Sequence, residues 1–151
     1  PKDSGYIVDV NIKGVIYCLH YQIKEMLKYA SQNNPCSIVN NSSILSHAGY
    51  PGLTVYSSTK HAVTGLTKSA SLDGRKYNIA CSQIDIGNAL TDLAAKFKDG
   101  VPQADGSIKA ESVMDVIHVA NAIVQIAKQP LDVNTQFMTI MATKMPFIGR
   151  G

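Results

Sequence analysis

A tyrosine and a lysine four residues apart are the first pair in this sequence that can do chemistry together. In the stretch VYSSTK, residues 55–60, they are Tyr56 and Lys60. A spacing of four places both side chains on one face of a helix, with Cβ atoms roughly 5–6 Å apart. A nearby ammonium favours the tyrosinate and lowers a phenol pKa that is otherwise about 10. Tyr56 is therefore a candidate general acid and base, although the pair taken alone is more simply read as a surface pair.

Composition and charge exclude several classes of protein. The chain has 151 residues, of which 45% are hydrophobic and 17% charged, so we expect one globular domain, residues 1–151. The net charge of +3 is dispersed, which argues against nucleic acid as a partner. No apolar run approaches the roughly 20 residues of a membrane span. The spacing of the three cysteines and four histidines predicts reduced thiols in the cytoplasm and no metal site.

Hydrophobic periodicity predicts alternating helices and strands. Helices are expected at 6–31, 55–75 and 112–128, and strands at 37–40, 79–84 and 136–143. Ser112 is expected to cap the last helix. Residues 42–52 and 87–110 are expected to be loops, the second with room for one short helix. This order predicts an α/β fold, a partial doubly wound Rossmann-type parallel sheet of three strands with flanking helices, whose first strand has one neighbour only.

The residues before Tyr56 strengthen its interpretation as a catalytic group. Residues 38–69 read IVNNSSILSHAGYPGLTVYSSTKHAVTGLTKS, with an Asn-x-Ser-Ser turn whose second serine, Ser43, lies thirteen residues before the tyrosine. This segment closely resembles the active-site segment of the short-chain dehydrogenase/reductase family. The resemblance extends over nearly the whole chain.

Two further segments carry the resemblance outside that region. The segment VDVNIKGV is similar to the family helix that holds a fourth polar residue, and Asn11 stands at the matching position. The segment QIDIGNALTD resembles a family segment that usually contains Pro-Gly and a later threonine. Gly87 and Thr91 match it, whereas Ile86 replaces the proline, so we expect the turn there to differ.

The resemblance implies a catalytic role for four residues. Tyr56 would donate a proton to a carbonyl during reduction, or accept one from a hydroxyl during oxidation. Ser43 would hydrogen-bond the same oxygen. Lys60 would lower the tyrosine pKa and, with Tyr56, hold the nicotinamide ribose. Asn11 would fix a water molecule in a proton relay.

The resemblance also implies a cofactor, either NAD or NADP. Thr91 and the backbone around Ile86 and Gly87 would meet its carboxamide, and the hydride would come from the cofactor itself. The loop at 88–110 would close over a small alcohol or carbonyl substrate. Family members typically associate through two helices, so residues 6–31 and 55–75 would build a homodimer or homotetramer.

One expected part of the family pattern does not occur in the sequence. The family's first half carries a Gly-rich turn for the pyrophosphate and the residue that selects NAD or NADP. The stretch HAGYPG does not join a strand to a helix start and is not that turn. We therefore expect the catalytic C-terminal part of an oxidoreductase, inactive in isolation. The alternatives are a non-catalytic fragment used for oligomerisation or binding, and a ligand-binding relative that keeps the four residues by descent.

Several of the matched polar residues also have a purely structural interpretation. Ser42 and Ser43 can cap a turn without touching a substrate. Asn11 can be an ordinary polar residue within a helix, and Thr91 can be a helix cap. The sequence alone leaves these interpretations beside the catalytic ones.

Four other residues near the motifs are open to the same question. His47 and His61 flank the site and are expected to be surface or supporting residues rather than ligands. Cys81 lies in a predicted strand and is expected in the core. Asp85 either touches the site or ends a strand, and the sequence does not decide between the two.

Overall fold

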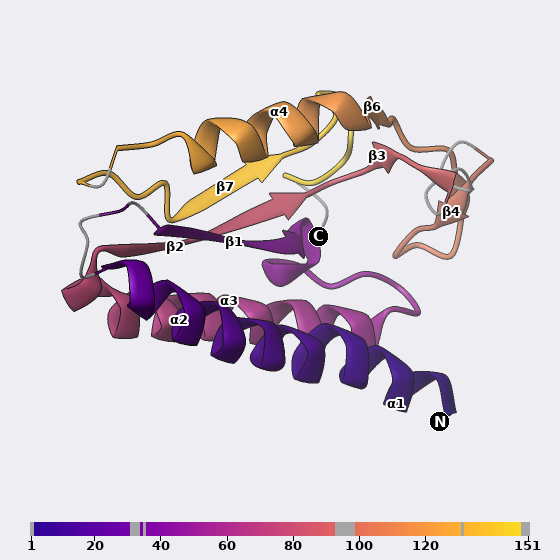
Figure 1. The fold of residues 1–151 in the computed structure, drawn as a ribbon. Coiled ribbons are helices and arrows are strands. Elements are labelled where there is room, and N and C mark those ends of the chain that lie inside the picture. Colours follow the sequence, from indigo (N-terminus) through magenta and orange to yellow (C-terminus); the bar gives the residue numbers. More distant parts are fainter. Residues whose placement is uncertain (1, 31–33, 35, 93–98, 131, 149–151) are drawn as a thin grey trace.

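Three parallel strands with helices on both sides form the centre of the fold (Figure 1). The structure is a computed structural model, and it describes residues 2–30, 34, 36–92, 99–130 and 132–148. The strands are β1 (Cys36–Ser43), β2 (Ile79–Ile86) and β7 (Phe137–Ile140), in the order β1-β2-β7. Among the described residues β1 pairs with β2 only. The predicted three-stranded parallel sheet is confirmed.

The helices form two layers, one on each face of this sheet. Figure 1 shows α2 (Val15–Ala30) and α3 (Thr54–Gly74) together on one face and α4 (Val116–Ala127) on the other. Parallel strands need such crossover helices, because each strand must start again from the same end of the sheet. Within the described residues no helix is both long and apolar enough to cross a membrane.

The middle strand β2 is buried on both faces and alternates between two cores. Ile84 packs against α4, in a cluster with Val119, Ala122 and Ile126. Cys81 faces the other way and packs with Leu19, Ile38, Ala70 and Ile79. Because side chains alternate along a strand, Gln83 and Asp85 share the face of Cys81, and both are fully buried despite being polar.

The first helical segment contains a π-helical turn. The predicted helix at 6–31 begins earlier, as α1 (Lys2–Val8), and continues through a π-helix at Asp9–Gly14 into α2. A π-turn carries one extra residue per turn and occurs frequently at functional sites. Here it contains Asn11, one of the four residues with a predicted catalytic role.

The remaining boundaries differ by a few residues from the prediction. Both β1 and β2 run longer than expected, so Ser42 and Ser43 belong to a strand, and Ile44–Ser46 form a 3₁₀ turn. The predicted cap at Ser112 is wrong. Met114 and Asp115 form the short strand β6 (Met114–Asp115), which keeps the chain extended, and Asp115 Oδ1 caps α4 by accepting from the Ile117 amide at 2.9 Å.

The expected loop at 87–110 contains three two-residue strands. They are β3 (Ala89–Leu90), which pairs with β6, and the antiparallel pair β4 (Val101–Pro102) and β5 (Ile108–Lys109). Residues 93–98 of this loop lie outside the described residues, so the one short helix expected within the loop stays a prediction. A 3₁₀ turn at Arg75–Tyr77 closes α3, and Asn78 follows it with a left-handed φ of 55°.

The burial of β2 gives a direct test of this arrangement. Ile84→Ala removes a fully buried side chain between the sheet and α4, so we expect the free energy of unfolding to fall by about 3 kcal/mol. Ile108→Ala is the control, because Ile108 is 65% exposed and its loss should change stability by less than about 0.5 kcal/mol. Urea denaturation followed by circular dichroism measures both. Equal losses would contradict the assignment of Ile84 to the core.

Candidate active site

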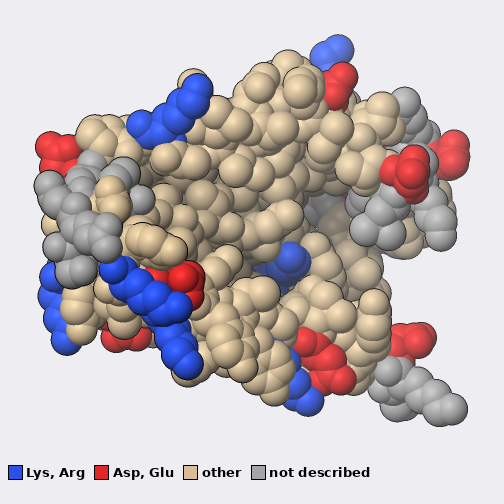
Figure 2. Space-filling model, viewed as in Figure 1, with Lys and Arg blue, Asp and Glu red and all other residues tan. Residues whose placement is uncertain are grey.

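The predicted catalytic residues gather where β1 and β2 end. The parallel register pairs Ser43 with Ile86, so the two strands stop at the same level. In open α/β sheets ligands bind at the carboxyl ends of the strands. Figure 2 shows a recess at this end, between the β3–β5 segment and the N-terminal ends of α1 and α3.

Ser43 caps a turn, which is one of the two interpretations that the sequence left open, and its catalytic role stays a prediction. It is buried and caps the 3₁₀ turn, because its Oγ accepts a hydrogen bond from the Leu45 amide at 3.2 Å. Its hydroxyl also lies near the Tyr56 phenol and acts to lower the pKa of that phenol. The cap fixes the serine hydroxyl in place, and the contact with Tyr56 brings together two groups that lie thirteen residues apart.

Tyr56 lies in the first turn of α3 and is half-buried. Burial disfavours the charged phenolate and raises the pKa of Tyr56, while the hydrogen bond from Ser43 lowers it by a smaller amount. The net shift of this pKa is therefore upward, and the predicted contribution of Lys60 to it stays a prediction. The ammonium of Lys60 lies over the face of the tyrosine ring, 5.4 Å from its centroid.

Lys60 lies one turn further along α3 and is also half-buried. Its Nζ donates a long hydrogen bond, 3.5 Å, to the carbonyl oxygen of Asn41 on β1. Burial lowers the pKa of Lys60, and the negative charge of Asp85 opposes that shift. The ammonium keeps donor capacity beyond this single long contact, because a lysine carries three N–H donors.

Asn11 reaches α3 rather than the strand ends. Its Nδ2 donates to the Thr59 hydroxyl at 3.0 Å, and Thr59 immediately precedes Lys60. Thr59 in turn donates to the Tyr56 carbonyl oxygen at 2.7 Å. The π-turn thus holds Asn11 against the helix that carries the tyrosine and the lysine. Its predicted relay role stays a prediction.

The residues predicted to meet a cofactor follow the end of β2. The strand ladder continues through Ile86 to Gly87, whose amide donates to the Ile140 carbonyl oxygen at 2.8 Å. A Cβ atom at Gly87 would lie 2.6 Å from Met141 Cβ, so only glycine fits there. Thr91 lies exposed just after β3.

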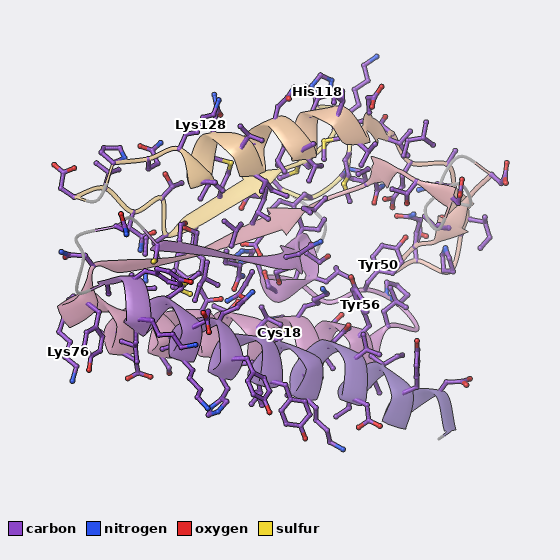
Figure 3. All side chains as sticks on the ribbon, in the orientation of Figure 1. Cys18, Tyr50, Tyr56, Lys76, His118 and Lys128 are labelled. Carbon is purple, nitrogen blue, oxygen red and sulfur yellow. The ribbon has the colours of Figure 1, made fainter. Side chains whose placement is uncertain are left out.

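A buried glutamate that the sequence did not single out joins three segments beside this site. Glu111 accepts hydrogen bonds from Asn88 Nδ2 at 2.8 Å, from Gln103 Nε2 at 3.1 Å and from the Tyr50 hydroxyl at 3.3 Å. Tyr50 packs in the same apolar cluster as Tyr56, and Figure 3 shows the two rings at the same end of the molecule. A single acidic residue in a polar segment gave no signal of this role.

Asp85, whose role the sequence left open, lies at the centre of a second buried group. Gln83 Nε2 donates to Asp85 Oδ1 at 2.7 Å, and Ser46 Oγ lies 2.8 Å from the same oxygen. His47 Nε2 lies 2.7 Å from Oδ2. His47 therefore supports a buried carboxylate. His61 instead contacts the Ser57 carbonyl oxygen of its own helix, at 2.9 Å. For the role of Asp85, the signal available in the sequence was the set of polar side chains within the otherwise apolar stretch IACSQIDI.

No cluster of three or more histidine, cysteine or acidic side chains that could hold a metal ion occurs within the described ranges. Cys81 is fully buried, as expected for a core residue, and burial raises the pKa of its thiol to about 11.

The reactive groups at the strand ends are a phenol, a hydroxyl, an ammonium and carboxamides. These groups can hold an oxygen atom and give it a proton, which suits carbonyl or alcohol chemistry.

Comparison with known proteins points to one family. The family model described as short chain dehydrogenase matches residues 2–102. A cyclohexanol dehydrogenase of Acinetobacter sp. (strain SE19) is 33% identical over 93 residues, which are 62% of this chain and 36% of that protein. Carbonyl reductase [NADPH] 2 of Sus scrofa is 33% identical over 120 residues, 73% of this chain and 46% of that protein. The chain spans less than half the length of these curated relatives.

Solved structures give the same result for the fold. ElxO with NADP bound is similar with a TM-score of 0.76 and 27% identity, over 93% of this chain and 57% of that one. A 3-ketoacyl-(acyl-carrier-protein) reductase from Brucella melitensis, complexed with NADH, has a TM-score of 0.79 at 21% identity over 95% and 59%. The second likeness is one of fold alone.

The contact between Ser43 and Tyr56 can be tested by titration. The serine hydroxyl stabilises the phenolate, so Ser43→Ala should raise the pKa of Tyr56 and move its ionisation to higher pH. Ultraviolet difference absorbance, with Tyr56→Phe as the blank, isolates this phenol from the other tyrosines. Ser58→Ala is the control, because exposed Ser58 bonds only the Thr54 carbonyl oxygen within α3. An unchanged or lower midpoint of the Tyr56 titration in Ser43→Ala would contradict the stabilisation of the phenolate by Ser43.

Proposed function

The chain belongs to the short-chain dehydrogenase family, and we propose that it carries the catalytic site of an NAD(P)-dependent oxidoreductase that interconverts an alcohol and a carbonyl. The observation that supports this most directly is the Lys60 ammonium over the Tyr56 ring, 5.4 Å from its centroid, with the Ser43 hydroxyl near the phenol. All three side chains converge at the carboxyl end of the sheet.

In this proposal Tyr56 is the acid and base. Its raised pKa keeps the phenol protonated at neutral pH, so it can donate a proton to the oxygen of a carbonyl substrate during reduction. In the oxidation direction the same oxygen atom accepts the proton of the alcohol. When substrate binds, the single O–H of Ser43 turns from the phenol to the substrate oxygen and holds that oxygen within reach of Tyr56.

The other two proposed residues hold this pair in position. The positive charge of Lys60 stabilises the negative charge that develops on the substrate oxygen. It also stabilises the phenolate that remains after proton transfer. Asn11 keeps the first turns of α3 in place through Thr59, which bonds the Tyr56 carbonyl oxygen.

The described residues fit the nicotinamide end of NAD or NADP. Lys60 has donors to spare for the ribose hydroxyls. The glycine at position 87 lets the backbone after Ile86 pack directly against Met141 and Met145. The backbone after Ile86 and the Thr91 hydroxyl would contact the carboxamide. When bound, the nicotinamide supplies or accepts the hydride. The ElxO structure holds NADP and the Brucella melitensis reductase structure holds NADH, which supports either dinucleotide here.

Replacement of the tyrosine separates an enzyme from a binding module. Tyr56→Phe removes the only proposed proton donor, so NAD(P)H oxidation with a carbonyl substrate should fall by at least roughly a thousandfold. Binding of the dinucleotide, measured by fluorescence titration, should change little. The protein assayed is the longest form that contains this chain.

Tyr77→Phe is the matched control for this experiment. Tyr77 is 38% exposed in the 3₁₀ turn at the end of α3 opposite Tyr56, so the loss of its hydroxyl should leave turnover unchanged. Full activity in Tyr56→Phe would exclude the proposed mechanism. Dinucleotide binding without turnover in the unaltered protein would instead favour the alternative of a non-catalytic binding module.

We also propose that the first helical segment mediates self-association. Tyr6, Val10, Tyr17 and Tyr21 are all at least half exposed and follow one another at spacings of four and seven residues. A spacing of four brings Tyr17 and Tyr21 to one face of α2, while Tyr6 and Val10 precede them across the π-turn. Exposed apolar side chains of this kind mark an interaction surface. A second copy of the chain is the proposed partner, as expected from the resemblance.

Charge placed on this face should weaken that association. Replacing Tyr17 and Tyr21 together by glutamate should shift the protein to a lower oligomeric state, because the interface would have to bury two carboxylates. Sedimentation velocity measures the mass in solution. The control is Ile108→Glu, an exposed apolar residue on β5, far from α2 in Figure 1. An unchanged mass in the double variant would place the interface elsewhere.

A further inference from the structure

The carboxylate of Asp85 is fully buried yet lies beside groups of the proposed active site. It comes from β2 and is 0% exposed. Its two oxygens are held by Gln83, Ser46 and His47, at 2.7–2.8 Å. A buried carboxylate is costly and needs such partners to remain charged. A hydrophobic side chain would fill the same space between the sheet and α3 at lower cost, so the presence of an acid needs another reason.

Ser46 connects this carboxylate to the catalytic serine. Its Oγ lies 2.8 Å from Asp85 Oδ1 and 2.7 Å from the main-chain carbonyl oxygen of Ser43. Both contacts are buried, and the single hydroxyl proton of Ser46 is shared between the two acceptors, so Ser46 bridges the carboxylate and the 3₁₀ turn at Ile44–Ser46. Asp85 therefore fixes one end of the turn whose other end presents the Ser43 hydroxyl.

His47 lies between the buried Asp85 carboxylate and the solvent. Its side chain is 42% exposed, whereas that of Asp85 is 0% exposed, and its Nε2 lies 2.7 Å from Asp85 Oδ2. An ionised carboxylate there takes the Nε2 proton as a hydrogen bond. The imidazole thus covers the carboxylate and keeps water from weakening its field.

We propose that Asp85 is a positioning residue for the proposed reaction, which holds the Ser43 turn through Ser46 and stabilises the positive charge of Lys60. This inference rests on the proposed function for its catalytic meaning. The contacts that carry it are properties of this chain alone. Neither Asp85 nor Ser46 needs to touch the substrate.

The electrostatic part concerns the groups that face Lys60 from each neighbouring element. Lys60 lies over the ring of Tyr56 on α3, and its ammonium contacts the Asn41 carbonyl oxygen on β1. Asp85 lies on the neighbouring strand β2, where it pairs with Ser42, the residue after Asn41. Its negative charge therefore acts on the ammonium. His47 acts on it only through Asp85. Asp85 favours the charged ammonium, whereas burial favours the neutral amine. Removing the carboxylate should therefore lower the pKa of Lys60.

The charge effect can be measured without any turnover. Lysine side-chain signals, labelled with ¹³C, are followed by nuclear magnetic resonance through a pH titration, with Lys60→Arg used to assign the signal. In Asp85→Asn the Lys60 signal should titrate at lower pH than in the unaltered chain. Ser82→Ala is the control, because Ser82 is equally buried in β2 but bonds Asn134 on the opposite face. An unchanged Lys60 midpoint in Asp85→Asn would overturn the electrostatic part.

The positioning effect needs a kinetic comparison. Ser46→Ala keeps the charge of Asp85 but removes the link to the Ser43 carbonyl oxygen, so kcat should fall on the order of tenfold with the Lys60 titration unchanged. Ser82→Ala should keep kcat within about twofold. Full kcat in Ser46→Ala would overturn the positioning part, even where Asp85→Asn fails to fold. If the unaltered protein turns over no carbonyl substrate, the proposed function fails, and the Lys60 titration still decides the role of Asp85.

Discussion

The parallel pairing of β1 with β2 is the constraint on which the site depends. Its register joins Ser43 to Ile86 and Ser42 to Asp85, so that two distant segments end side by side. Because strands in a parallel sheet end on the same edge, the polar residues at both ends meet there. The crossover helix α3 then returns across the same face and brings Tyr56 and Lys60 to that edge.

A series of buried polar side chains between this sheet and α3 is joined by hydrogen bonds within the series, although the buried Ser42 and Ser57 hydroxyls nearby have no such partner. Asn40 donates to the Thr67 hydroxyl at 2.9 Å, Thr67 lies 3.0 Å from Gln83 Oε1, and Gln83 donates to Asp85. Each buried polar atom in this series therefore has a partner, which offsets the cost of removing it from water. Such a connected group favours one relative position of sheet and helix, because sliding either would break several bonds at once.

An apolar cluster around Tyr50 and Tyr56, together with Glu111, lines another side of the site. Tyr50 and Tyr56 pack against buried Leu45 and Met145, and Tyr50 also bonds Glu111 beyond them. Glu111 in turn holds Asn88, directly after the glycine that ends the sheet ladder. The segment after β2 and the segment before α3 are thus tied to one buried carboxylate. Loops tied in this way place side chains as firmly as regular elements do.

Periodicity predicted the main helices and strands, and the family resemblance of the motifs predicted Asn11, Ser43, Tyr56 and Lys60 as site residues, because both depend on neighbours along the chain. The sequence did not determine the start of α4, since a pairing with β3 extends the residues before it. Only the tertiary structure decided the direction of the Tyr56 pKa and the roles of Asp85 and Glu111. Burial sets the first, and the other two depend on contacts between residues about 40 and 60 positions apart, which no local pattern encodes.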